Sequence, residues 1–124
     1  MKTLFLVEDN QDNADLICDL VGNDYHIVCF PEANSALTTL IQPDSFLPNL
    51  LLLDISLPGM DGTTLLRQIR LHDRLKHIPA IALTAHAMKD DKESLMSAGF
   101  NAYLSKPITD DALLFQTIKH HILN

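Results

Sequence analysis

The sequence has few of the residues that mark fibrous, disordered or disulfide-framed chains. Its 124 residues include four glycines, six prolines and two cysteines. With 47% hydrophobic and 20% charged residues, the composition is that of an ordinary globular domain, which excludes disorder and fibrous structure. A chain of this length buries roughly two-thirds of its unfolded surface, so one core needs no disulfide or structural metal. We therefore expect a single domain over residues 1–124.

Long apolar runs and an excess of basic residues are also missing. No apolar run approaches the ~20 residues of a membrane span. The apolar segment at the start of the chain ends at the acidic residue Glu8, which makes it too short for the apolar region of a signal peptide. Sixteen acidic against nine basic residues give a formal net charge of -7, which opposes binding to nucleic acid or anionic lipid. We expect a soluble, cytoplasmic protein that binds neither. Cys18 and Cys29 stand among apolar residues, which predicts reduced thiols buried in the core.

Short apolar segments alternate with segments of helical periodicity. Five of the former predict strands, at residues 4–7, 25–30, 50–53, 78–83 and 102–104. Most are continuous apolar runs, typical of parallel strands covered on both faces. Between them, apolar residues recur at helical spacing, as in Ala14, Ile17, Cys18 and Val21. This alternation needs right-handed crossovers and predicts an α/β fold, a doubly wound parallel sheet with helices on both faces. The fourth helix, residues 88–98, has a poor apolar stripe, so we expect it to dock most weakly.

The ends of the predicted strands are unusually polar. The first predicted strand is followed by Glu8 and Asp9, and the third by Asp54. The fourth is followed by Thr84, and the fifth is followed closely by Lys106. In open α/β sheets, ligands bind beyond the carboxyl ends of the strands. Carboxylates about 5 Å apart repel by ~3 kcal/mol per pair at an effective dielectric near 20, so a positive group must offset them. Lys106 can contribute, and Mg²⁺ fits better because it prefers carboxylate and phosphate oxygens.

Calcium and soft metals suit these residues less well. The sequence has no alternating ligand loop with glycine of the EF-hand type, and its six histidines show no ligand spacing with cysteine. A carboxylate beside Mg²⁺, a hydroxyl and a lysine has what phosphoryl transfer needs. Asp54 is the best candidate for the nucleophile, because it directly follows the apolar run of a central strand. Taken singly, Thr84 could be a capping residue and Lys106 a solvated charge, and the joint pattern favours function.

Four segments together resemble the receiver domain of two-component response regulators, of the single-domain chemotaxis-regulator kind. They occur in the family's order and spacing at residues 6–10, 53–62, 83–87 and 103–107. The resemblance covers the whole chain. It implies a flavodoxin-like (βα)5 sheet with strand order 2-1-3-4-5.

The resemblance also implies a role for each site residue. Asp54 would accept the phosphoryl group. Mg²⁺ would be held by the acidic pair Glu8 and Asp9, by Asp54 and by the backbone carbonyl of Ser56, with Glu8 acting largely through water. The phosphoryl oxygens would be held by Thr84 and Lys106, and Pro107 would follow a cis peptide bond. Ser56, Ala85 and His86 would surround the entrance of the site.

A conformational switch and a set of partners follow from the same resemblance. Tyr103 would turn inward as the Thr84 hydroxyl moves toward the phosphoryl group. This would remodel the face formed by helix four, strand five and helix five, where a downstream protein would bind. The phosphodonor would be a histidine kinase or a histidine phosphotransfer protein. We expect a monomer or weak dimer.

Other interpretations remain open at this point. The domain could stand alone, or it could be a receiver excised from a hybrid histidine kinase. A flavodoxin-like cofactor binder would need a phosphate-binding loop after the first strand, where Glu8 and Asp9 would repel phosphate. A haloacid dehalogenase-type phosphatase would need an acid two residues after Asp54, where Ser56 stands. A degenerate receiver that acts by binding alone would not need the complete set of site residues.

Overall fold

Strands and helices alternate strictly along the chain. The computed structural model describes residues 1–44, 46–85 and 89–123. The elements are β1 (Thr3–Val7), α1 (Gln11–Val21), β2 (His26–Phe30), α2 (Ala33–Leu40), β3 (Leu50–Asp54), α3 (Gly62–Arg70), β4 (Ala80–Thr84), α4 (Lys89–Ala98), β5 (Ala102–Ser105) and α5 (Asp111–His121). None of the helices within these ranges has the length and apolar character needed to cross a membrane.

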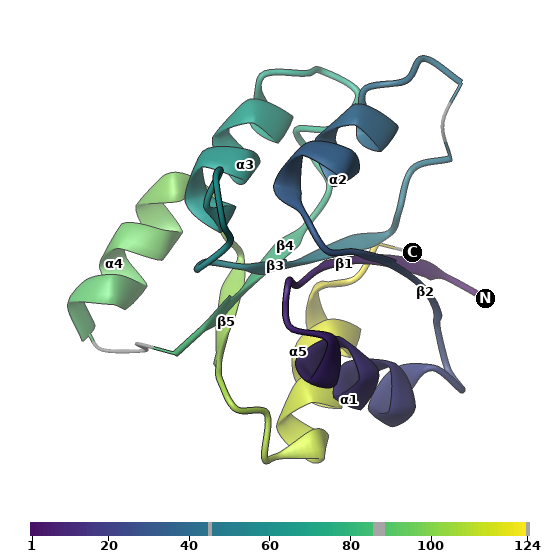
Figure 1. Ribbon diagram of the computed structural model, residues 1–124, viewed down its shortest axis with the longest axis vertical. Helices are drawn as coiled ribbons and strands as arrows, with labels where there is room; N and C mark the ends of the chain where they lie inside the picture. The colour runs from purple at the N-terminus through teal and green to yellow at the C-terminus, as the bar shows by residue number, and fades with distance from the viewer. Residues whose placement is uncertain (45, 86–88, 124) are drawn as a thin grey trace.

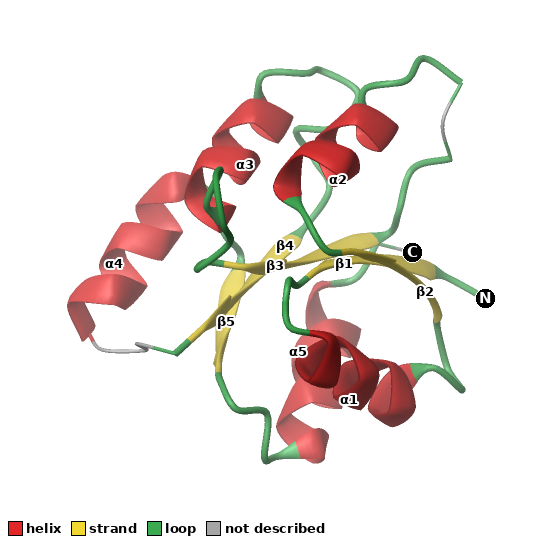
Figure 2. Ribbon diagram, viewed as in Figure 1, coloured by secondary structure: helices red, strands yellow, loops and turns green. Residues whose placement is uncertain are grey.

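The strands form one parallel sheet between two helical layers. Its order is β2-β1-β3-β4-β5, and all four neighbouring pairs are parallel. Helices α2, α3 and α4 cover one face, and α1 and α5 cover the other (Figures 1 and 2). This arrangement confirms the expected α/β fold with strand order 2-1-3-4-5. Because the chain order reverses between β1 and β3, the carboxyl ends of these two strands meet at the centre of the sheet.

The two faces of the sheet bury two separate cores. In β3, Leu51 and Leu53 pack in the core under α2, α3 and α4, whereas Leu50 and Leu52 pack in the core under α1 and α5. All four leucines are fully buried. Successive side chains of a strand point to opposite faces of the sheet. A strand covered on both faces therefore needs apolar residues at every position, and its sequence is an uninterrupted apolar run. That is why this segment shows no polar alternation in the sequence.

The part of helix α4 whose burial the structure describes, residues 92–98, buries few apolar side chains, in line with the poor apolar stripe of its sequence. Among its residues 92–98, Leu95 is buried and Ala98 is half-buried, while Lys92, Met96 and the others are exposed. A single leucine thus makes the main apolar contact in this part of the helix. Few buried apolar contacts make an element easier to displace than its neighbours.

The cysteines differ from expectation. The prediction that Cys18 and Cys29 are buried in the core is wrong, because Cys18 is half-buried and Cys29 is exposed. The reason lies in the position of β2, which is an edge strand, with the exposure pattern exposed, half-buried, half-buried, exposed, half-buried. An edge strand has a neighbour on one side alone, so its apolar residues are covered less completely.

Candidate functional site

Three buried polar side chains gather at the carboxyl ends of neighbouring strands. Glu8 follows β1, Asp54 ends β3 and Thr84 ends β4, and they are 4%, 2% and 5% exposed. They are the buried polar or charged residues found in the part of the chain that the structure describes. Buried carboxylates are rare unless they are paired or bind metal. Their position at one edge of the sheet therefore points to a functional site.

Asp9 completes an acidic cluster with Glu8 and Asp54. Each of the three offers a carboxylate oxygen, and these oxygens all lie within 4.8 Å of one another. Glu8 and Asp54 are buried, whereas Asp9 is exposed. The cluster is thus open to solvent on one side and closed by the sheet on the other. Hard oxygen ligands at this spacing match the requirements of Mg²⁺.

Lys106 bridges the two buried carboxylates. Its Nζ atom lies 3.0 Å from Asp54 Oδ2 and 3.2 Å from Glu8 Oε2. The Lys106 side chain is 17% exposed, so these ion pairs are largely withdrawn from water. Its backbone N–H donates to the carbonyl oxygen of Thr84 at 2.8 Å, which ties the end of β5 to β4. The peptide bond between Lys106 and Pro107 is cis.

The electrostatics of the cluster follow from this burial. Burial is the main factor that raises the pKa of Glu8 above its ordinary value; the negative charge of Asp54 adds to the increase, and Lys106 opposes it. Burial lowers the pKa of Lys106, but hydrogen bonds and charge interactions with Asp54 and Glu8 outweigh it, so that the pKa is raised overall. Lys106 therefore stays protonated. A further cation would offset the burial and the repulsion from Asp54 that disfavour the charged form of Glu8.

Backbone groups fix the orientation of both carboxylates. The Ser56 N–H donates to Asp54 Oδ1 at 3.0 Å, and the Asn10 N–H donates to Glu8 Oε1 at 3.2 Å. Ser56 is exposed at the rim of the site. Because Asp54 Oδ2 accepts from Lys106, both oxygens of Asp54 are held in place. A carboxylate fixed in this way needs little reorganisation before it reacts.

The loop after β3 passes unusually close to Asp54. A Cβ atom at Gly62 would collide with the carbonyl oxygen of Asp54, so the close approach requires glycine here. The Gly62 N–H donates to the Ile55 carbonyl at 3.1 Å. Asp61 caps α3 by accepting from the Thr64 N–H at 2.8 Å. These supporting residues were missed by the sequence analysis as parts of the site, although an aspartate followed by glycine before an apolar helix is a recognisable cap signal.

Thr84 and Ala85 lie at the edge of the site. Thr84 follows Leu83, which pairs with Asp54 in the register of β3 and β4. Ala85 is exposed directly after it. His86 lies outside the described residues. The structure thus brings Glu8, Asp9, Asp54 and Lys106 into direct proximity and places Thr84 one strand away.

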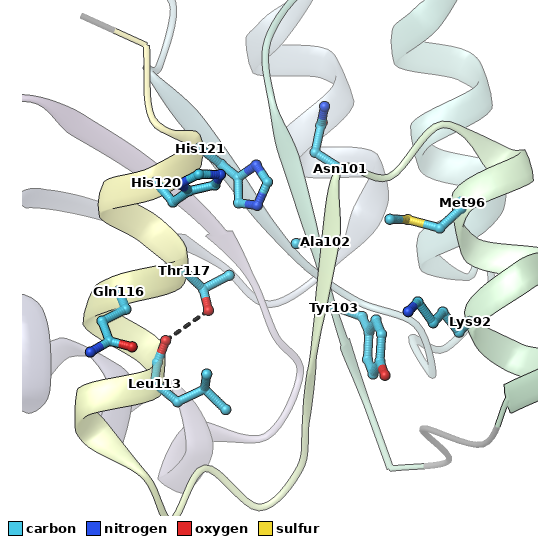
Figure 3. A pocket seen from close by; sticks show the side chains of 10 residues that line it. All are labelled: Lys92, Met96, Asn101, Ala102, Tyr103, Leu113, Gln116, Thr117, His120 and His121. Carbon is cyan, nitrogen blue, oxygen red and sulfur yellow. Dashed lines mark hydrogen bonds between the residues drawn. The ribbon is translucent and has the colours of Figure 1, made fainter.

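Tyr103 lies on a different surface, on β5. It is half-buried and lines a groove of about 460 Å³ between α4 and α5. Figure 3 shows its ring on the α4 side of β5, beside Lys92, with His120 and His121 at the far end of α5. Tyr103 pairs with Ala82, two residues before Thr84 on β4. The chain therefore connects the buried site to this groove through adjacent strands.

Comparison with known proteins decides the family. The family model of the response regulator receiver domain matches residues 4–119. The chain is a response regulator receiver domain. It is 36% identical over 122 residues to the polar-differentiation response regulator DivK of Brucella anthropi, and the match covers 98% of this chain and 96% of DivK. DivK of Brucella melitensis shows the same identity and coverage.

Solved structures of other receivers share the fold. The receiver domain of sensor histidine kinase PA1611 from Pseudomonas aeruginosa, with magnesium coordinated in its active site cleft, matches with a TM-score of 0.83 at 30% identity, covering 97% of this chain and 96% of that one. The chemotaxis protein CheY4 of Vibrio cholerae gives a TM-score of 0.87 at 18% identity, covering 98% and 99%, and supports the fold alone. The family model and the DivK relatives favour the receiver over the flavodoxin-like cofactor binder and the phosphatase.

Proposed function

We propose that Asp54 accepts a phosphoryl group and that the acidic cluster binds Mg²⁺. One observation carries the proposal: Asp54 is 2% exposed, yet it lies in a solvent-accessible cluster of three carboxylates and 3.0 Å from the ammonium of Lys106. A buried, positioned carboxylate beside a cation is suited to act as a nucleophile on phosphorus. The family and the position of the cluster at the strand ends agree with this role.

The donor set fits Mg²⁺. Glu8, Asp9 and Asp54 offer carboxylate oxygens within one cluster. The family resemblance adds the backbone carbonyl of Ser56 as a ligand and would have Glu8 act largely through water. Such hard oxygen donors favour Mg²⁺ over soft metals. When bound, Mg²⁺ would neutralise the carboxylates and the charge that develops on the phosphoryl oxygens. The metal-bound receiver of PA1611 supports this choice of ion.

The chain's own residues would perform the transfer. An oxygen of Asp54 attacks the phosphorus of a phosphohistidine or a small acyl phosphate. A new O–P bond forms, and the bond from phosphorus to the donor nitrogen or oxygen breaks, with its electron pair leaving on the donor. Lys106 moves from the carboxylates to a phosphoryl oxygen, and the Thr84 hydroxyl donates to another. Because Lys106 already reaches Asp54 at 3.0 Å, this movement is short.

The same residues would govern loss of the phosphoryl group. In autodephosphorylation, water attacks the phosphorus of the Asp54 acyl phosphate and the O–P bond to Asp54 breaks, which restores the carboxylate. Ser56 and Ala85 are exposed. The family resemblance assigns both to the entrance of the site, where Ser56 would tune the lifetime of the phosphoryl group and the small Ala85 would admit the phosphodonor. His86 is assigned to the same entrance from the family resemblance. The receiver acts in this respect as a self-catalysing signalling domain.

The phosphodonor would be a histidine kinase or a histidine phosphotransfer protein. The output surface would be the groove between α4, β5 and α5, which includes Tyr103, Met96 and Leu113 (Figure 3). Met96 and Leu113 are 44% and 49% exposed, so the surface offers apolar area to a protein partner. Sparse burial of α4 makes this surface adjustable. The cytoplasmic location and the monomer or weak dimer stay predictions.

The direct test is phosphorylation by acetyl phosphate with Mg²⁺, followed by intact-mass measurement. The wild-type chain gains one phosphoryl group, of about 80 Da, and the Asp54→Asn variant gains none. Asp12→Asn is the matched control, because Asp12 is an exposed acid in the first turn of α1. Equal labelling of wild type and Asp54→Asn would place the acceptor elsewhere.

A further inference from the structure

The two cysteines of the chain meet in space although they come from different elements. The Sγ atoms of Cys18, on α1, and Cys29, on β2, lie 3.4 Å apart. Both thiols are free. Neither cysteine belongs to the acidic cluster, and the receiver function makes no use of the pair.

The fold explains why the two thiols meet. Cys29 pairs with Leu6 in the parallel register of β1 and β2, and Leu6 packs in the core under α1 and α5. Paired residues of neighbouring strands project to the same face of a sheet, so Cys29 projects toward α1. On α1, Cys18 follows the buried Ile17 and lies at the margin of the buried stripe. The pair therefore spans the seam where α1 covers the edge strand.

We propose that Cys18 and Cys29 form a reversible intramolecular disulfide, a redox modification site that ties α1 to β2. A disulfide needs a sulfur–sulfur distance of about 2.05 Å, so the two sulfurs must approach by a further ~1.3 Å. Side-chain rotation can supply this movement. Cys29 is exposed and Cys18 is half-buried, so a small reagent reaches the pair from solvent.

The oxidant class is a small-molecule disulfide such as glutathione disulfide. One protein thiol loses its proton, and its sulfur attacks a sulfur of the reagent, so the reagent's disulfide bond breaks and one glutathione thiolate leaves. The second protein sulfur, after losing its proton, attacks the mixed disulfide and expels the second thiolate. The protein loses two electrons and two protons, and the reagent becomes two molecules of glutathione. This sequence balances atoms and electrons.

The surroundings of Cys29 make this thiol slow to react at neutral pH. Although Cys29 as a residue is exposed, its sulfur is partly covered; this partial burial, the hydrogen bond and charge of Cys18 and the negative charge of Asp15 raise the pKa of Cys29 to about 12. The thiolate is the reactive form, so a raised pKa keeps Cys29 mostly protonated and slows its oxidation until the solution becomes more alkaline. This protection suits a pair that stays reduced in ordinary conditions.

The test is intact-mass measurement after incubation with glutathione disulfide at a pH of about 8.5. The wild-type chain loses about 2 Da without a disulfide to a second chain, and dithiothreitol restores the original mass. The Cys18→Ser and Cys29→Ser variants each stop at the mixed disulfide, about 305 Da heavier, because the resolving thiol is missing. Wild-type protein that also stops at the mixed disulfide, stays unmodified, or links between chains would overturn the proposal.

Two further measurements separate this proposal from the proposed function. The Asp54→Asn variant forms the disulfide as readily as wild type, so failure of the phosphoacceptor assignment leaves this result unchanged. The oxidised wild type melts at a temperature about 5–10 °C higher than the reduced form, because the cross-link restricts the unfolded chain. Loss of 2 Da without any rise in melting temperature would contradict a bond that ties α1 to β2.

Discussion

Lys106 lies between two buried carboxylates from different strands: its Nζ atom is 3.0 Å from Asp54 Oδ2 and 3.2 Å from Glu8 Oε2. One ammonium thus offsets two acids that are almost without solvent contact. The arrangement leaves a net negative charge in the site, to which exposed Asp9 adds. Under the proposed function, a bound cation would balance this charge and free Lys106 to bind a phosphoryl oxygen.

Replacement of Lys106 tests this charge balance. In Mg²⁺-free buffer, Lys106→Met should lower the free energy of unfolding by about 2 kcal/mol, because it leaves Glu8 and Asp54 buried without their partner. The loss should shrink by at least ~1 kcal/mol in an Asp54→Asn background, where one buried charge is gone. Urea denaturation of the wild type, the two single variants and the double variant measures both effects. Lys119→Met, at an exposed lysine of α5, is the control and should change stability by less than about 0.5 kcal/mol.

Mg²⁺ should stabilise the folded chain. At a concentration ten times the dissociation constant, a ligand that binds the folded state alone adds about 1.4 kcal/mol to stability, which is a rise of several degrees in melting temperature. Asp54→Asn should weaken this rise and Asp9→Asn should remove most of it, while Asp12→Asn keeps it. Calorimetry or thermal fluorescence in a Mg²⁺ titration gives the comparison. A wild-type melting temperature that does not change in millimolar Mg²⁺ would contradict the metal site.

Tyr103 should report on the state of Asp54. The chain has two tyrosines, so fluorotyrosine labelling gives two fluorine resonances, and Tyr25→Phe assigns them. Beryllofluoride with Mg²⁺ mimics the phosphoryl group, and its addition should shift the Tyr103 resonance and leave Tyr25 unchanged. Thr84→Ala should abolish the Tyr103 shift, because the hydroxyl that links the two positions is missing. A Tyr103 resonance that moves equally in Thr84→Ala would rule out this coupling.

Much of the fold can be predicted from the sequence because the parallel sheet imposes a simple pattern. A run such as Leu50–Leu53 is covered on both faces, and a covered strand needs apolar residues at every position. Polar residues at the strand ends then indicate a site, since strand ends meet at one edge. The strand order 2-1-3-4-5 is different: it came from the family resemblance, because periodicity does not say which strands are neighbours.

Other features depend on contacts that no local pattern contains. The exposure of Cys29 follows from β2 being an edge strand, and its approach to Cys18 follows from the register between β1 and β2. Lys106 binds Glu8, which lies 98 residues before it in the sequence, and Asp54, which lies 52 residues before it. The need for glycine at residue 62 arises from the passage of the loop against Asp54. Each requires the folded arrangement in three dimensions.

The central claim is that Asp54 becomes an acyl phosphate, and reductive trapping tests it most directly. Borohydride reduces an aspartyl phosphate to homoserine, which lowers the mass of that residue by about 14 Da and marks its position permanently. After treatment with acetyl phosphate and Mg²⁺, peptide mass spectrometry should locate homoserine at residue 54 and leave Glu8, Asp9 and Asp61 unmodified. Homoserine at another acid, or none at residue 54 in a chain that has gained a phosphoryl group, would contradict the account.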